Sequence, residues 1–183
     1  MNLPNKLTIL RIVLTFVFII FLFTNGLLTK IVAFLLFTFA SITDVLDGFI
    51  AKKNNQITDF GKLMDPIADK ILVLSAFIAF VVMRIIPVWM VIIIILRESA
   101  VTALRAIALT KGKVIQADST GKNKTIWQMF VIALILLFLI FDKTSRYHDI
   151  IFTLMLITVF FTLISGISYL FKNKEVYYNA KTH

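Results

Sequence analysis

The chain has 183 residues, of which 60% are hydrophobic and only 16% are charged. Soluble domains carry about 45–50% apolar and about 25% charged residues, so this composition excludes a soluble fold and, by its low polarity, disorder. The absence of cysteine excludes disulfides and thiolate chemistry. In so apolar a chain, the formal charge of +9 is expected to meet anionic lipid headgroups rather than nucleic acid.

Six apolar segments predict membrane-spanning helices, because roughly 20 helical residues cross the hydrocarbon core of a bilayer. In chain order they cover roughly residues 7–24, 29–50, 63–82, 86–108, 126–141 and 149–171. The sequence shows neither an internal repeat nor an interdomain linker. We therefore expect an all-α integral membrane protein with one domain over residues 1–183.

The distribution of Lys and Arg predicts the orientation of these spans. With the N-terminus in the cytoplasm, thirteen Lys and Arg residues fall in inside segments and four in outside segments. Cytoplasmic loops carry the excess of positive charge in membrane proteins. Both termini are thus expected on the cytoplasmic side.

The acidic residues are concentrated at the end of the second span and the start of the third. Five of the ten acidic residues lie within a stretch of 26 positions; they are Asp44, Asp47, Asp59, Asp65 and Asp69. Asp44 and Asp47 are spaced i,i+3 and Asp65 and Asp69 i,i+4, so each pair projects from one helical face. Four carboxylates in one pocket repel one another unless cations neutralise them, and Mg²⁺ or Mn²⁺ suits oxygen ligands and phosphate substrates. The sequence therefore predicts a polar, metal-binding pocket at the cytoplasmic side.

Two simpler interpretations stay open for this region. The carboxylates could pair only with the nearby lysines, which are Lys52, Lys53, Lys62 and Lys70. The small residues Gly48, Ala51 and Gly61 would let a ligand approach the backbone, or would serve close helix packing.

Residues 44–69 read D-V-L-D-G-F-I-A-K-K-N-N-Q-I-T-D-F-G-K-L-M-D-P-I-A-D. This string resembles the signature of the CDP-alcohol phosphatidyltransferase family, D-x2-D-G-x2-A-R-x8-G-x3-D-x3-D. Seven of the eight fixed positions are identical, with the correct spacing. The departure is Lys52, where the family usually has Arg, so the charge is retained but the planar two-pronged donor is lost.

The resemblance implies a mechanism. Asp44, Asp47 and Asp65 would hold a pair of divalent ions with help from Asp69, and the ions would bind the diphosphate of a CDP-linked lipid. Asp69 would be the general base that deprotonates the acceptor hydroxyl, which attacks the β-phosphorus and releases CMP. Homodimers are usual in the family, so a homodimer is expected. The other signature residues expected at the CDP-lipid are Gly48, Ala51, Lys52 and Gly61.

Asn5, Thr8 and Arg11 repeat every three residues near the cytoplasmic boundary of the first span. Similar N-x2-T-x2-R strings begin members of the family, near the nucleotide. The resemblance thus implies that Asn5 and Thr8 contact CDP and that Arg11 pairs with the Asp cluster or with phosphates. The alternative is a helix cap with an Arg that extends to solvent.

A candidate pocket for an acceptor phosphate comprises Arg97, Arg105, Lys122 and Lys124. The two Arg residues are eight positions apart and share a helical face, and the two Lys residues open the fifth span, where helix N-termini favour anions. The alternatives are an ion pair of Arg97 with Glu98 or an Asp, and ordinary inside charge for the lysines. Two further residues, His148 and His183, are not expected to be catalytic.

The opening M-N-L-P-N-K-L-T-I-L-R and the stretch F-G-K-L-M-D-P-I-A-D-K are similar to bacterial family members whose acceptor is sn-glycerol 3-phosphate. The expected reaction joins CDP-diacylglycerol and glycerol 3-phosphate to give phosphatidylglycerophosphate and CMP in a bacterial-type plasma membrane. Inositol phosphate or serine is the alternative acceptor. A cation transporter with an intramembrane Asp cluster is the alternative from another class.

Overall fold

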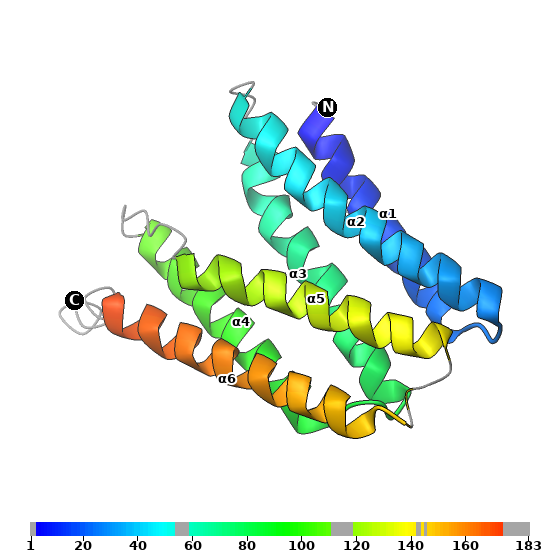
Figure 1. Cartoon of the computed structure of the whole chain (residues 1–183). Helices are drawn as coiled ribbons and strands as arrows, with labels where there is room; N and C mark the ends of the chain where they lie inside the picture. Colours follow the sequence, from blue (N-terminus) through cyan, green and yellow to red (C-terminus); the bar gives the residue numbers. More distant parts are fainter. Residues whose placement is uncertain (1–2, 54–58, 111–118, 142–143, 145, 174–183) are drawn as a thin grey trace.

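The structure is a computed structural model of the chain. It describes the backbone at residues 3–53, 59–110, 119–141, 144 and 146–173, and the side chains at residues 6–43, 68, 70–108, 123–141, 144 and 146–173. Within these ranges the regular structure is entirely helical (Figure 1). The helices are α1 (Leu3–Phe23), α2 (Leu27–Lys53), α3 (Asp59–Val82), α4 (Val88–Thr110), α5 (Ser119–Ile140) and α6 (His148–Lys172).

All six predicted spans are helices, and three of them are long and apolar enough by composition alone to cross a membrane. These are the segments Lys6–Phe23, Asn123–Ile140 and His148–Lys172, found among the described residues. Two shorter apolar stretches, Leu27–Thr43 and Lys70–Val82, lie in α2 and α3. In both helices the apolar stretch is continued by the segment that carries the Asp pairs, so the polar residues extend the helices beyond their apolar parts.

The bundle is built on α1, which packs on α2 and α3, while α5 packs on α2 and α6, and α4 packs on α3 and α6. Apolar side chains fill the centre, and the rings of Phe18 and Phe37 have their centroids 5.8 Å apart. Ala33, Ala40 and Ala76 are completely or almost completely buried. Small residues at such positions allow the close backbone approach on which helix association in lipid depends.

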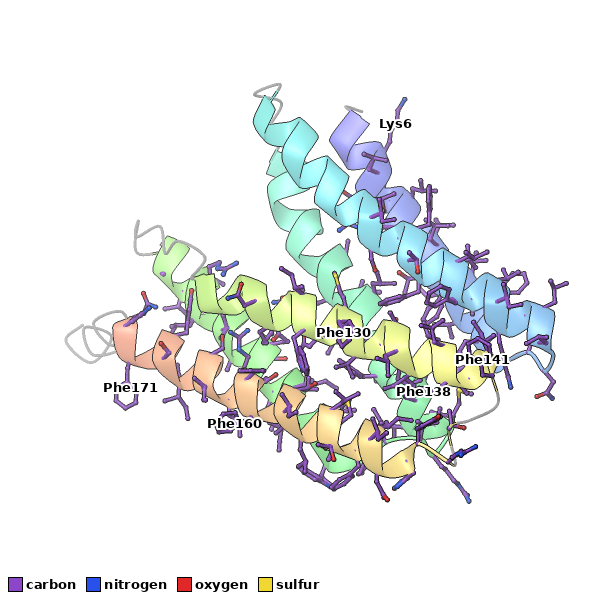
Figure 2. The ribbon with its side chains drawn as sticks, viewed as in Figure 1. Lys6, Phe130, Phe138, Phe141, Phe160 and Phe171 are labelled. Carbon is purple, nitrogen blue, oxygen red and sulfur yellow. The ribbon has the colours of Figure 1, made fainter. Side chains whose placement is uncertain are left out.

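The outer surface of the bundle is apolar. Phe160 and Phe171 project away from the bundle on α6 (Figure 2), and their exposed fractions are 61% and 72%. Phe16 on α1 and Phe130 on α5 are likewise exposed. A soluble protein rarely exposes apolar surface so extensively, whereas lipid covers it without cost. The fold is therefore that of an all-α integral membrane protein.

Successive helices alternate in direction, which brings polar helix ends to one side of the bundle. The beginning of α1, the end of α2 and the beginning of α3 lie together, and the ends of α4 and α6 lie near the beginning of α5 (Figure 1). Gly26 forms the turn between α1 and α2 with φ of +137°, a backbone conformation that side chains disfavour. The helix ends that carry Asn5, Thr8 and the two Asp pairs lie on the side opposite this turn (Figure 1).

Candidate active site

The two Asp pairs lie on continuous helices, as their spacing predicts. Asp44 and Asp47 belong to the last turns of α2, and Asp65 and Asp69 to the first turns of α3. Each pair therefore lies on one face of its helix. The two helix ends lie beside each other in Figure 1. The four side chains are outside the described residues, so the shared carboxylate pocket stays a prediction.

Several other predicted site residues are placed by the backbone alone, because their side chains are also outside the described set. Their positions are Asn5 in α1, Gly48, Ala51 and Lys52 in α2, Gly61 in α3, and Lys122 in α5.

Thr8 and Arg11 lie on the buried face of α1. Both have an exposed fraction of 0%, whereas Lys6 points away from the bundle (Figure 2). The Thr15 hydroxyl donates to the Arg11 carbonyl at 2.8 Å one turn further along. An Arg that extends to solvent would expose its guanidinium, so the alternative of a solvent-directed Arg11 is excluded. A fully buried guanidinium is stable only where acceptors compensate its charge.

The predicted basic residues of α4 and α5 come together around Glu98. Arg97 Nη1 donates to Glu98 Oε1 at 3.0 Å, and Lys124 Nζ donates to the same oxygen. Arg97 Nη2 also donates to Ser165 Oγ of α6 at 2.7 Å. The ion pair of Arg97 with Glu98, which was the simpler interpretation of Arg97, is therefore present, and it extends to Lys124. Sequence reasoning had not predicted the central role of Glu98.

Lys70 connects this group to the helix that carries Asp65 and Asp69. Its ammonium group donates to Thr102 Oγ1 and lies 3.5 Å from the Glu98 carbonyl oxygen. The sequence indicates Lys70 only as a possible partner of the carboxylates. We call Lys70, Arg97, Arg105 and Lys124 the basic cluster.

Arg105 lies on α4, as predicted, and one of its buried donor atoms is unsatisfied. Its Nε is buried and has no hydrogen-bond partner among the residues that the structure describes. Arg105 is close enough to Arg97 for their charges to repel. Among the described side chains, Arg97, Arg105 and Lys124 thus set three cations against the single carboxylate of Glu98. Such an excess favours an anionic ligand.

Gly166 gives Arg97 the space to lie against α6. A Cβ atom at this position would be 2.9 Å from Arg97 Cγ, which is closer than real Cβ contacts. Without a side chain, Gly166 lets the arginine cross α6 and reach Ser165, one residue earlier. Neither Ser165 nor Gly166 stands out in the sequence, because both read as ordinary small residues of a packed span.

A buried polar seam joins α5 to α6 and fixes the position of Lys124. Trp127 Nε1 donates to Thr158 Oγ1 at 3.1 Å, and Gln128 Nε2 donates to Thr162 Oγ1 at 3.4 Å. Both donors lie within one turn of Lys124, which is 3% exposed. His148, by contrast, begins α6 at the other side of the bundle, and His183 is outside the described residues.

The donor set on α2 and α3 fits a hard divalent cation. It consists of carboxylates at helical spacings, on two helix segments that lie together at one end of the bundle. Mg²⁺ and Mn²⁺ prefer such oxygen donors. No cluster of three or more His, Asp or Glu occurs among the side chains described, which leave out all four of these Asp residues.

Comparison with known proteins agrees with this arrangement. Residues 1–164 match the family model described as CDP-alcohol phosphatidyltransferase. A CDP-diacylglycerol–glycerol-3-phosphate 3-phosphatidyltransferase of Bacillus subtilis is 41% identical over 95% of this chain and 96% of its own length. The protein of the same name from Rickettsia bellii is 40% identical over 97% of both chains. A probable phosphatidylglycerophosphate synthase of Mycobacterium tuberculosis is 37% identical over 92% of this chain and 79% of its own length. The chain therefore belongs to the CDP-alcohol phosphatidyltransferase family and is a membrane-bound transferase of phospholipid biosynthesis.

Proposed function

We propose that the protein transfers the phosphatidyl group of CDP-diacylglycerol to sn-glycerol 3-phosphate, which gives phosphatidylglycerophosphate and CMP. The names of the relatives support both substrates. The observation in the structure that supports a phosphorylated acceptor is that Arg97, Arg105 and Lys124 gather around one described carboxylate, that of Glu98. A phosphorylated acceptor needs this countercharge, and serine, which has no phosphate, does not.

In the proposed reaction the acceptor hydroxyl attacks the β-phosphorus, which bears the diacylglycerol. A new P–O bond forms to the acceptor, and the P–O bond to CMP breaks. Asp69 takes the hydroxyl proton, which raises the nucleophilicity of the oxygen as attack begins. Arg97, Arg105, Lys122 and Lys124 bind the acceptor phosphate and orient the hydroxyl.

Family members use divalent metal ions. We propose two Mg²⁺ or Mn²⁺ ions held by Asp44, Asp47 and Asp65 with help from Asp69. When bound, such ions neutralise diphosphate charge and stabilise the charge that develops on the leaving group. Asn5, Thr8, Gly48, Ala51, Lys52 and Gly61 are proposed to contact the CDP-lipid. The burial of Thr8 on the face of α1 that is turned into the bundle supports its part in this set.

The proposed setting is a bacterial-type plasma membrane, with one domain over residues 1–183 and with both termini and the active site in the cytoplasm. The Lys and Arg distribution supports this topology, as does the position of the helix ends that carry the Asp pairs at the same side of the bundle as the beginning of α1 (Figure 1). A homodimer remains part of the proposal. Membership of a transferase family removes the alternative of a cation transporter.

An acceptor panel tests the proposed function. Purified protein in detergent–lipid micelles receives CDP-diacylglycerol and Mg²⁺ with glycerol 3-phosphate, inositol 1-phosphate, serine or glycerol. We expect CMP release and a new lipid only with glycerol 3-phosphate. Glycerol and serine carry no phosphate group for the basic residues to bind, and inositol 1-phosphate is not the acceptor in the names of the relatives. A higher kcat/KM with inositol 1-phosphate or serine would contradict the proposed acceptor.

A further inference from the structure

Tyr169 on α6 has a buried hydroxyl that is unsatisfied in its hydrogen bonding. The residue is 4% exposed and packs with Val101 and Leu104 of α4. Its hydroxyl has no hydrogen-bond partner in the described part of the chain. A buried polar group without a partner loses its hydration and gains nothing in return. A phenylalanine would fill the same apolar space without this loss, so packing alone does not account for the hydroxyl.

The register of α4 against α6 places Tyr169 between two arginines. Arg97 contacts Ser165 and Gly166, which fixes these two levels of the helices side by side. One turn further along both helices, Tyr169 meets Val101 and Leu104. Since α4 and α6 run in the same direction (Figure 1), Arg105 follows on α4 one turn beyond Val101. Arg97, Tyr169 and Arg105 therefore follow one another along the interface between α4 and α6.

Three buried donor groups along the interface between α4 and α6 lack a hydrogen-bond partner among the described residues. Arg97 Nε, Arg105 Nε and the Tyr169 hydroxyl are each buried and without a hydrogen-bond partner among the described residues. The two guanidinium groups can only donate, and the phenol can donate as well. A ligand that satisfies all three must present several acceptor oxygens and negative charge, as a phosphate group does.

We infer that Tyr169 is a substrate-binding residue, whose hydroxyl donates to a phosphate oxygen of the acceptor between Arg97 and Arg105. The inference rests on the proposed function for the identity of the acceptor. It adds α6 to the helices that recognise the phosphate. It also gives Gly166 and Ser165 a role, since they set the level at which Tyr169 meets α4.

Tyr169→Phe tests the inference, because it removes the hydroxyl and keeps the ring against Val101 and Leu104. We expect the KM for glycerol 3-phosphate to rise roughly tenfold, which is the loss of one charge-assisted hydrogen bond. The KM for CDP-diacylglycerol should stay the same. The melting temperature without ligand should stay equal or rise, and its increase on addition of inorganic phosphate should shrink. Tyr147→Phe is the matched control, since Tyr147 stacks on Phe138 at the other side of the bundle, with ring centroids 4.7 Å apart.

The outcomes separate this inference from the proposed function. An unchanged KM together with an unchanged phosphate-dependent melting shift would overturn the role of Tyr169. Equal losses for both substrates, with a lower melting temperature, would overturn it in favour of a packing role. If the wild-type protein rejects glycerol 3-phosphate in the acceptor panel, the proposed acceptor fails. The phosphate-dependent shift then still tests whether Tyr169 binds a phosphate group.

Discussion

The acidic pairs and the basic cluster are both charged groups inside an apolar bundle, but they are built in different ways. The acidic pairs come from two consecutive helices, α2 and α3, at spacings that put like charges together. The basic cluster draws on α3, α4 and α5 and is bonded to a carboxylate, that of Glu98, and to a hydroxyl from α6. Like charges on neighbouring turns depend on an external cation, whereas a partly neutralised cluster keeps its geometry by itself. Substitutions in the two regions should therefore differ in size and in the constant that they affect.

The largest effect is expected from the acidic pairs. Asp44→Asn, Asp47→Asn or Asp65→Asn should each lower turnover by about 10³-fold or more, because bound metal supplies several kcal/mol of transition-state stabilisation. CMP release from CDP-diacylglycerol at saturating Mg²⁺ measures the loss. Asp149→Asn, an exposed carboxylate at the start of α6, is the control and should be neutral. Near-normal activity in any two of the three variants would contradict a shared metal site.

A substitution of Asp69 distinguishes its role as a general base from a role as a metal ligand. Asp69→Asn should reduce kcat by about 10²–10⁴-fold, the usual contribution of a general base. Affinity for CDP-diacylglycerol should change much less, because the other three carboxylates remain. Single-turnover rates and equilibrium binding of the CDP-lipid measure the two quantities. A variant that binds neither metal nor CDP-lipid would show that Asp69 is chiefly a ligand.

Substitutions in the basic cluster should weaken the binding of the acceptor rather than lower turnover. Arg105→Gln should raise the KM for glycerol 3-phosphate more than tenfold, on the order of 1.4 kcal/mol or more, because it removes a guanidinium that can bind phosphate oxygens in a bidentate way and whose buried Nε has no hydrogen-bond partner among the described residues. Lys124→Gln should raise it less, since Lys124 is paired with Glu98. The KM for CDP-diacylglycerol should hardly change in either variant.

Arg146→Gln is the matched control for these variants, since Arg146 is exposed at the other side of the bundle. Both KM values are measured for each protein. Equal losses for both substrates, or no loss, would show that the basic cluster serves only to anchor the helices.

The smallest effect is expected at Gly166. Gly166→Ala places a methyl group 2.9 Å from Arg97 Cγ, so the arginine must shift and its bond to Ser165 lengthens. A weakened rather than deleted charge-assisted bond should raise the KM for glycerol 3-phosphate roughly two- to fivefold. Ile167→Ala, an exposed neighbour on α6, should leave this KM unchanged. A wild-type KM in Gly166→Ala would mean that the position of Arg97 against α6 does not matter for the acceptor.

Hydropathy predicted all six helices, but it located the apolar stretch rather than the helix ends. The fifth helix begins at Ser119 rather than at residue 126, and the third at Asp59 rather than at residue 63. Hydropathy detects the part of a helix that lies in lipid, whereas polar turns such as S-T-G-K-N-K continue the helix into water. The Asp spacing was readable for a related reason, because the periodicity of a single helix determines which residues share a face.

Contacts between helices were less predictable. Lys124 and Glu98 are 26 positions apart, and Arg97 and Ser165 are 68 apart. No periodicity relates such pairs, since they depend on the crossing and rotation of separate helices. The sequence did indicate Arg97 and Arg105 by the high cost of charge in a span, and Lys124 by its place near the beginning of the fifth span. It could not show that Glu98 joins two of them or that the buried Nε of Arg105 has no hydrogen-bond partner among the described residues.

The threonines of α6 have a consequence for the order in which the protein assembles. The hydroxyls of Thr158 and Thr162 donate to carbonyls four positions earlier in their own helix, at 2.8 and 2.7 Å, and their oxygens also accept from α5. As a separate helix in lipid, α6 therefore holds these hydroxyl protons in bonds of its own. The side-chain amide of Gln128 on α5 donates to Thr162, so this hydrogen bond forms only after α6 has been synthesised and inserted. The later helix completes the polar bonding of the earlier one.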